Sequence, residues 1–254
     1  MDARVRMCLA ELIGTFALVL AGAGTACALH VLAGSRSSAG TALAVALAEG
    51  CTLAVLLTAA WHVSPGCLNP AVTLMLWVFK RVEGVALLLL LVAMQLLGSL
   101  LAGLVLRACF ADEVLRRAHW GAPHLKAFLG PDYAVTMGSL IGGIGVEVCL
   151  TFLVATAVFA TLLDPRRPRL GGVGVGMAQT AAVLFGFWLT GGAANPALWF
   201  GPALWERTLP SPLPPGPLAD HPVYWAGPVV GALAGGFFYS AVVLPPTKGT
   251  EPHS

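Results

Sequence analysis

The chain has 254 residues, of which 57% are hydrophobic and only 10% are charged, and its formal net charge at pH 7 is +2. Soluble domains are typically about a quarter charged, so this composition excludes an ordinary soluble protein and predicts one embedded in a lipid bilayer. The small net charge gives no indication of nucleic-acid binding.

Six apolar segments are long enough to cross a membrane as helices, which takes about 20 residues. In chain order they are residues 8–33, 41–62, 84–107, 136–163, 171–190 and 222–244. The first segment follows basic residues, as the core of a signal peptide does, but it is longer than the roughly 7–15 residues of such a core. We therefore expect it to be retained as the first of six spans. The last residues, 246–254, are expected to form a short disordered tail.

An even number of spans places both termini on the same side of the membrane. If that side is the cytoplasm, the basic residues facing it are Arg4, Arg6, Lys80, Arg81, Arg166, Arg167, Arg169 and Lys248. Those on the other side are Arg36, Arg107, Arg116, Arg117, Lys126 and Arg207. The excess of basic residues on the cytoplasmic side is small. Short loops have the greatest weight in the positive-inside rule, however, and the short loop DPRRPR is strongly basic. We expect both termini to be cytoplasmic, in an integral multi-pass protein of the plasma membrane.

Two further apolar stretches, NPAVTLMLWVFK (69–80) and NPALWFGPALWE (195–206), are too short to span. As helices of about 12 residues they would rise about 18 Å, roughly half of the hydrocarbon core. Asn is a favoured N-cap residue and Pro a favoured first helical residue, so each Asn-Pro-Ala motif predicts the start of a half-helix. The motif residues are Asn69, Pro70, Ala71, Asn195, Pro196 and Ala197.

The sequence also contains an internal repeat. ELIGTF (11–16) and EVCLTF (147–152) share the pattern Glu-x-x-x-Thr-Phe, and each lies in the first span of its half. The chain therefore divides into repeats of about 8–107 and 136–244, each with three spans and one half-helix. Because three is odd, the second repeat is inverted relative to the first. Inverted repeats place functional sites near the membrane midplane, at discontinuous helices. The half-helix N-termini are expected to meet there and to form a polar path.

These features, with the segments AELIGTF, GCLNPAVTL, AMQLLGSLLAG and NPALWFGPAL, resemble the aquaporin, or major intrinsic protein, family. The resemblance covers nearly the whole chain. It implies an all-α membrane protein, a right-handed bundle of six transmembrane helices with two re-entrant half-helices. Residues 1–245 would form a single channel domain with one pore, usually within a homotetramer. The implied function is a passive channel for water and small neutral solutes such as ammonia, urea or glycerol. No cofactor and no enzyme activity are expected.

The expected mechanism of proton exclusion is electrostatic. A helix N-terminus carries about half a positive charge, so two that face the pore centre repel cations, as in aquaporin-type channels. The Asn69 and Asn195 amides would donate to a passing water and orient it against relaying a proton. By the resemblance, Glu11 and Glu147 accept hydrogen bonds from the backbone of the re-entrant loops, and Gln95 plays a similar supporting part. The alternative is that the two glutamates lie in the permeation path.

The family's outer selectivity filter maps by residue count onto Glu49, Val183, Gly192 and Leu198. The family usually has Arg at the position of Leu198, so this filter is less polar and lacks one electrostatic barrier to cations. Val183 and Gly192 are small, and small residues at these positions resemble those of channels that pass ammonia, urea or glycerol. For Glu49 three alternatives stay open: it lines the pore, it pairs with a nearby arginine or backbone group, or the count is displaced.

Six cysteines are scattered through apolar segments and indicate neither a disulfide nor a metal site. Cys67, two residues before Asn69, is either a reactive thiol at the inner pore mouth or a buried inert one. Two other functions remain as alternatives to a water channel. One is a cation-leaky channel, indicated by Glu49 and Leu198, and the other is a non-conducting structural or junctional membrane protein with the same fold.

Overall fold

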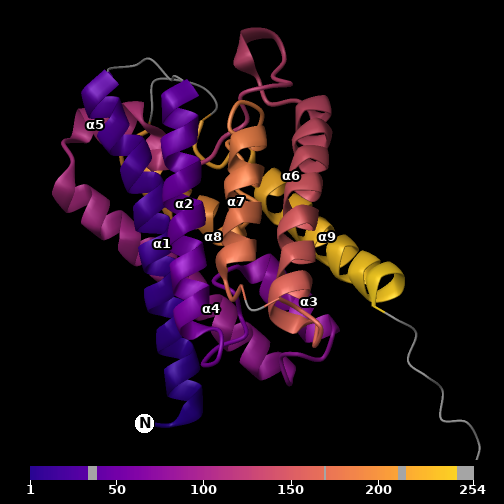
Figure 1. Ribbon diagram of the computed structural model, residues 1–254. Helices are drawn as coiled ribbons and strands as arrows, with labels where there is room; N and C mark the ends of the chain where they lie inside the picture. Colours follow the sequence, from indigo (N-terminus) through magenta and orange to yellow (C-terminus); the bar gives the residue numbers. More distant parts are fainter. Residues whose placement is uncertain (34–38, 169, 211–215, 245–254) are drawn as a thin grey trace, which may run out of the picture.

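The computed structural model describes residues 1–33, 39–168, 170–210 and 216–244, and in this part of the chain the secondary structure is entirely helical (Figure 1). The long helices are α1 (Ala3–Ala33), α2 (Ala39–Ala60), α4 (Val85–Cys109), α6 (Met137–Val158), α7 (Val173–Gly186) and α9 (His221–Phe238). The short ones are α3 (Pro70–Val78), α5 (Asp112–Arg117) and α8 (Pro196–Glu206), with single turns at η1 (His119–Gly121) and η2 (Pro131–Tyr133). Wider turns, η3 (Phe159–Leu163) and η4 (Tyr239–Val243), continue α6 and α9.

This arrangement confirms the predicted architecture of six spans and two half-helices. Five spans are long and apolar enough to cross a membrane, and the sixth is α7 with 14 residues, about 21 Å long. The prediction of a continuous span over 171–190 was wrong at its end. The amide groups of Leu189, Thr190 and Gly191 all donate to the carbonyl of Gly186, which makes a tight turn instead of a further helical turn. The predicted tail, 246–254, lies outside the described residues.

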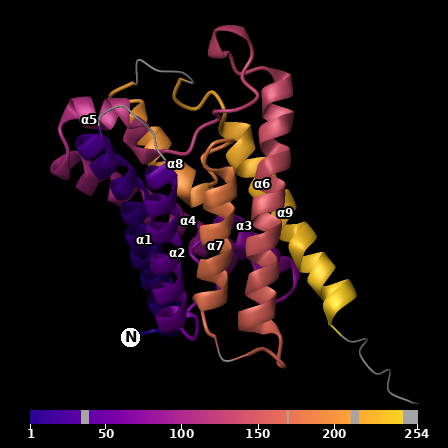
Figure 2. The ribbon, with the colours of Figure 1, turned by 45° about the horizontal axis from the view of Figure 1, so that its top comes forward.

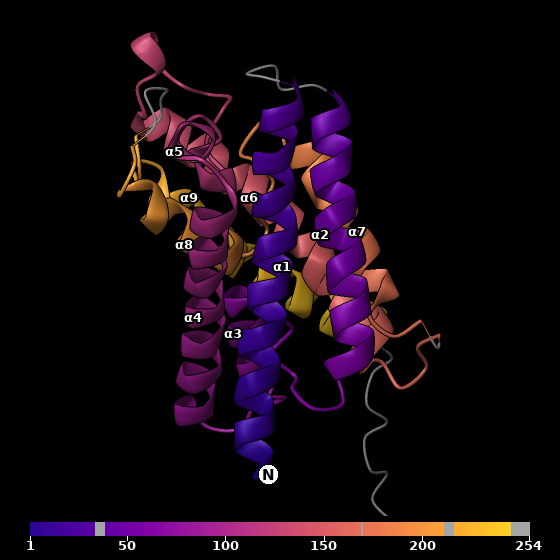
Figure 3. The same ribbon diagram turned by 90° about the vertical axis from the view of Figure 1, so that its left-hand side faces the viewer.

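The helices pair as an inverted repeat requires. Helix α1 packs along α4, and its counterpart α6 packs along α9, while α2 and α7 pack against each other. Each half-helix rests on the last span of the other repeat, α8 on α4 and α3 on α9. Figure 3 shows α4, α1 and α2 side by side, and Figure 2 shows the start of α1 and the end of α9 towards one end of the bundle, with α5 towards the other.

Two glycines, one in each repeat, allow equivalent close contacts between helices. A Cβ atom at Gly98 on α4 would overlap the carbonyl oxygen of Leu12 on α1. A Cβ atom at Gly231 on α9 would likewise overlap the carbonyl oxygen of Val148 on α6. In both repeats the contacted residue directly follows the glutamate of the repeated motif. Small residues allow such approach in membrane helices, where packing provides much of the stability.

The bundle is apolar outside and contains buried polar side chains inside. Large hydrophobic side chains such as Val55, Ile141 and Phe185 are exposed on three different spans, as contact with lipid or a neighbouring subunit requires. The polar residues buried within the spans include Glu11, Glu49, Gln95, Glu147 and Gln179. A charged or polar group inside a membrane is costly and needs a partner, so these side chains indicate where the site lies.

Candidate functional site

The two Asn-Pro-Ala motifs begin the half-helices. Pro70 is the first residue of α3, and the side-chain oxygen of Asn69 accepts hydrogen bonds from the amides of Ala71 and Val72, at 3.0 and 3.3 Å. In the second repeat Pro196 begins α8. The side-chain oxygen of Asn195 accepts from the amide of Ala197 at 2.9 Å. Each asparagine oxygen is thus used in capping its own helix, which fixes the direction of the amide nitrogen.

The two asparagines also join the half-helices to each other. The amide nitrogen of Asn69 donates to the carbonyl of Ala194 at 2.9 Å, and that of Asn195 donates to the carbonyl of Leu68 at 3.0 Å. Ala194 and Leu68 each directly precede the opposite asparagine. A side-chain amide nitrogen carries two hydrogens. In the described part of the chain only one of the two on each asparagine has an acceptor, which leaves one donor on each for a small polar molecule.

Glu11 on α1 holds the first re-entrant loop. Its carboxylate accepts from the Ser64 hydroxyl at 2.5 Å and from the Leu68 amide at 3.0 Å. Gln95 on α4 donates to the same carboxylate at 2.6 Å and to the Thr73 hydroxyl at 2.8 Å. Three of the side chains that hold the loop, those of Glu11, Thr73 and Gln95, are each 1% exposed or less. Because they are buried in the membrane-spanning bundle, each needs these internal partners.

Glu147 on α6 holds the second loop in the same way. Its carboxylate accepts from the Thr190 hydroxyl at 2.6 Å and from the amides of Ala193 and Ala194 at 3.2 and 2.7 Å. The backbone before each asparagine is left-handed, with φ of 57° at Leu68 and 48° at Ala194. This unfavourable conformation turns the amides towards the carboxylates, whose hydrogen bonds stabilise it.

Three of the four predicted filter residues share one neighbourhood. Gly192 packs directly on α7, because a Cβ atom there would lie 2.9 Å from the Cα atom of Val183. Gln179, one turn earlier on α7, donates to the Glu49 carboxylate at 2.9 Å and to the carbonyl of Ala193 at 3.3 Å. The fourth residue, at position 198, is buried in the first turn of α8 and packs with the main hydrophobic core.

Glu49 is 6% exposed, and its hydrogen-bond donor is an amide side chain. Across the described ranges no arginine or lysine forms an ion pair with this carboxylate. Gly22 on α1 makes room for it, since a Cβ atom at Gly22 would lie 2.6 Å from a Glu49 oxygen. Cys67 is a free thiol that is 3% exposed and packs in the main core.

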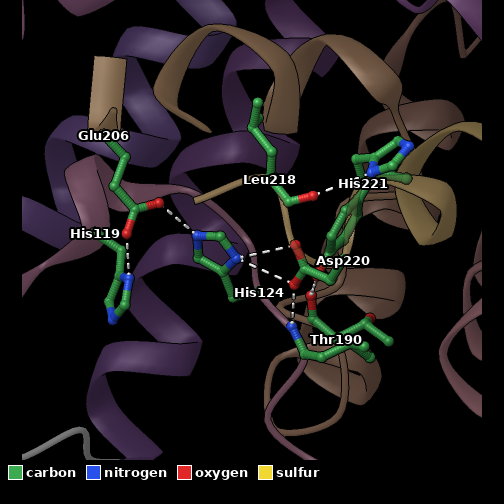
Figure 4. A network of polar contacts seen from close by, with 9 residues as sticks. His119, His124, Thr190, Glu206, Leu218, Asp220 and His221 are labelled. Carbon is green, nitrogen blue, oxygen red and sulfur yellow. Dashed lines mark hydrogen bonds and ion pairs between the residues drawn. The ribbon is translucent and has the colours of Figure 1, made fainter. Parts of the chain in front are cut away.

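A largely buried polar cluster joins the segment after α5 to the end of α8 and the start of α9 (Figure 4). No motif identified in the sequence predicted this cluster. The Glu206 carboxylate, at the end of α8, accepts from Nδ1 of His119 at 2.6 Å and from Nε2 of His124 at 2.8 Å. Nδ1 of His124 donates to Asp220 at 3.1 Å, and the Leu125 amide donates to the same aspartate oxygen at 2.8 Å. We call His119, His124, Glu206 and Asp220 the cap cluster.

The His124 ring carries a positive charge at neutral pH, between the two carboxylates of the cap cluster. Burial alone would lower the pKa of His124, but hydrogen bonds and charge attraction from Asp220 and Glu206 outweigh burial and raise its pKa to about 9. One weak signal for the cluster is present in the sequence, two histidines five residues apart in AHWGAPHLK. Their acidic partners are more than 80 residues away in the chain, so no local pattern could predict the contact.

The segment that carries these histidines lies against the second re-entrant loop. A Cβ atom at Gly191 would lie 2.7 Å from the Cα atom of Pro123 and 3.1 Å from the amide nitrogen of His124. The Lys126 ammonium donates to the carbonyl of Phe187 at 2.8 Å, and the Lys126 backbone amide donates to the carbonyl of Leu189. One end of the loop that carries Gly192 is thus covered by residues 123–127.

Comparison with known proteins places this geometry in a family. The family model described as "Major intrinsic protein" matches residues 2–239. Aquaporin TIP4-4 of Zea mays is 41% identical over 244 residues, covering 94% of this chain and 87% of the relative. Aquaporin A of Dictyostelium discoideum is 35% identical over 233 residues, covering 92% and 77%. The X-ray structure of the aquaglyceroporin from Plasmodium falciparum superposes with a TM-score of 0.74 at 19% identity, covering 94% of this chain and 97% of that one.

Proposed function

Because the chain belongs to the major intrinsic protein family, the aquaporins, we propose that it conducts water passively and excludes protons at its two Asn-Pro-Ala motifs. Membership alone makes it an integral, multi-pass membrane protein, a channel for water or small solutes and not an enzyme. The finer proposal concerns the solute, the residues that act on it and the exclusion of protons.

The observation that carries the proposal is the meeting of the half-helix N-termini. Asn69 and Asn195 donate to each other's loops and keep one amide hydrogen each for a further acceptor. A water between them would accept from both amides and point its own hydrogens away, towards the two ends of the pore. It could not then accept a proton from a neighbouring water. The positive ends of the α3 and α8 dipoles oppose a cation at the same point.

We propose that Glu11, Glu147 and Gln95 support this centre and do not line the path. The hydrogen bonds of the two carboxylates run to the re-entrant loops and to neighbouring side chains. Hydrogen bonds of this kind offset the free-energy cost of burying a carboxylate. The motif residues, including Pro70, Ala71, Pro196 and Ala197, set the helix starts that aim the amides.

We propose that Glu49, Val183, Gly192 and Leu198 form the outer filter. The contact between Gly192 and Val183 and the bridge from Glu49 through Gln179 to the loop support this assignment. Without the usual arginine, Leu198 gives a less polar filter that suits water and ammonia. Urea and glycerol are weaker candidates, and NPALWFGPALWE lacks the Asp that follows the motif in many glycerol channels. The thiol of Cys67 would have no direct part.

Flux through purified channels in proteoliposomes tests the proposal. We expect water efflux in an osmotic jump to exceed that of empty vesicles, and an internal pH dye to report no added proton leak. Ammonia, urea and glycerol are then compared on the same vesicles. No gain in any flux would favour the non-conducting structural or junctional protein and refute the proposal.

A cation leak is the second candidate, because the filter has a carboxylate at Glu49 and no arginine at position 198. In the part of the chain that the structure describes, the partner of Glu49 is the amide of Gln179, and no basic side chain forms an ion pair with Glu49. Current across a planar bilayer decides between the two. If the channel conducts water but carries no ionic current across the bilayer, the result supports a channel for neutral solutes. A cation current refutes the exclusion of cations.

We further propose a homotetramer in the plasma membrane with both termini cytoplasmic. The even number of spans and the basic DPRRPR loop support the orientation, and the exposed apolar faces of the spans suit contact with lipid and with neighbouring subunits. Chemical cross-linking of the purified protein tests the tetramer. Protease protection of a terminal tag and microscopy of a fluorescent fusion test the orientation and the membrane. The repeat boundaries of about 8–107 and 136–244 stay a prediction.

A further inference from the structure

The geometry points to a second site: we propose that the cap cluster binds one divalent transition-metal ion, of the class of Zn²⁺, through His119, His124 and Glu206. This site is distinct from the pore centre, and its existence does not depend on the proposed water flux. The inference departs from the sequence analysis, which indicated no metal site.

The ligand atoms are already gathered. Nδ1 of His119, Nε2 of His124 and a carboxylate oxygen of Glu206 all lie within 4.8 Å of one another. Zinc binds histidine nitrogens and carboxylate oxygens at about 2.0–2.2 Å, so tetrahedral ligands lie about 3.3 Å apart. The two ring nitrogens now contact different oxygens of Glu206, at 2.6 and 2.8 Å, and each of these separations has to widen by less than about 1 Å. The two nitrogens, which lie within 4.8 Å of each other, also have to come to about 3.3 Å. The ion would replace the protons that the two rings now share with Glu206, and these protons leave to solvent.

Asp220 orients one of the ligands as metal sites require. A histidine that binds a metal usually donates its other ring N–H to a carboxylate or a carbonyl, which fixes the ring and its tautomer. Nδ1 of His124 donates to Asp220, and the Leu125 amide holds that carboxylate in place (Figure 4). This arrangement directs Nε2 of His124 to the centre of the cluster.

The donor set and the burial indicate the kind of ion. Two imidazoles and one carboxylate suit Zn²⁺, Cu²⁺ or Ni²⁺, whereas Mg²⁺ and Ca²⁺ prefer oxygen ligands alone. The side chains of His124 and Glu206 are 4% and 0% exposed, whereas that of His119 is 17% exposed. An ion can therefore reach the cluster past His119, and a water can complete its coordination from the same side.

Zinc titration of the full-length chain in detergent, with any histidine tag removed and after treatment with EDTA, tests the proposal. We expect calorimetry to show one saturable site per chain, and Co²⁺ to give the visible absorption of a tetrahedral site. Mg²⁺ should produce neither signal. Bound zinc should also raise the apparent melting temperature, because it binds the folded state alone.

Variants of the proposed ligands test whether zinc binds at the cap cluster and not elsewhere on the chain. His119→Ala, at the least buried ligand, and Glu206→Gln should each weaken zinc binding by about 10-fold or more, and Asp220→Asn by about 10- to 100-fold. His221→Ala is the matched control, because His221 lies beside Asp220 but is exposed and contacts the carbonyl of Leu218. Gel filtration and melting without metal verify the fold of each variant. Absence of a saturable site, or equal affinity in His119→Ala and the original chain, overturns the proposal whatever the water flux.

Discussion

The substitution Gly192→Ala tests how tightly the second re-entrant loop is held against α7. Gly192 has φ of +72°, a left-handed conformation that a residue with a Cβ atom adopts only at a cost of about 1–3 kcal/mol. The new Cβ atom would also lie 2.9 Å from the Cα atom of Val183 and 3.2 Å from the carbonyl oxygen of Ala182. Both are backbone atoms that cannot rotate away, so overpacking adds about 1–3 kcal/mol.

Gly84→Ala is the matched control, because it separates the two costs. Gly84 also has a positive φ of +78°, with a ψ of 146° that residues with a Cβ atom rarely adopt, but nothing lies within 4 Å of the position of a new Cβ atom. The control therefore loses only the conformational part. For a chain of this size about 1 kcal/mol lowers the melting temperature by about 2–4 °C. We expect Gly192→Ala to melt about 10 °C below the original chain and Gly84→Ala to melt about 4 °C below it, by the same estimate.

The assay is thermal unfolding in one detergent, followed by water flux in proteoliposomes. The loop displaced by the new Cβ atom carries the amides of Ala193 and Ala194 that Glu147 binds, so we expect flux to fall in Gly192→Ala and to persist in Gly84→Ala. A melting temperature of Gly192→Ala equal to that of the original chain would refute the reasoning, because neither the left-handed conformation nor the contact with α7 would then have a measurable cost.

Three other substitutions test the site. Leu198→Arg should restore a cationic barrier and lower ammonia and urea flux relative to water flux in stopped-flow vesicle assays; unchanged selectivity would show that the filter assignment is wrong. Glu147→Gln should destabilise the chain by about 1–3 kcal/mol, because an amide hydrogen then faces one of the three donors. The control Glu113→Gln, at an exposed ion pair, should change stability by less than about 1 kcal/mol, and equal melting of the two variants contradicts the role of Glu147. Ser99→Ala removes two hydrogen bonds from α4 to the α8 backbone and should lower the melting temperature by several degrees; an unchanged value would mean that the link contributes nothing.

The parts of the fold that the sequence predicted are those set by local chemistry. Span lengths follow from hydrophobicity, and the starts of α3 and α8 follow from the capping preference of Asn and the backbone of Pro. The end of α7 was predicted too late, because the turn that ends it depends on three amides that converge on Gly186.

Contacts between distant segments could not be predicted in the same way. The partner of Glu49 is Gln179, 130 residues later in the chain, and one of the alternatives for Glu49 named an arginine or the backbone, not an amide side chain. The cap cluster joins a loop after α4 to the end of α8 and the start of α9, and no repeat or motif marks it. The loop-support role of Glu11 and Glu147 is a prediction from the family resemblance, since a buried glutamate by itself does not identify its acceptor role.

The reciprocal bonds of the two asparagines also constrain how the chain is made. The carbonyl that Asn69 contacts belongs to a residue 125 positions later, so a ribosome must complete most of the second repeat before the first half-helix finds its partner. Until then the Asn69 amide at the start of α3 lacks this hydrogen-bond acceptor within the bilayer or its surroundings. The first repeat, expressed alone, should therefore be degraded by the quality control of the cell, and co-expression of both halves as separate chains should rescue it.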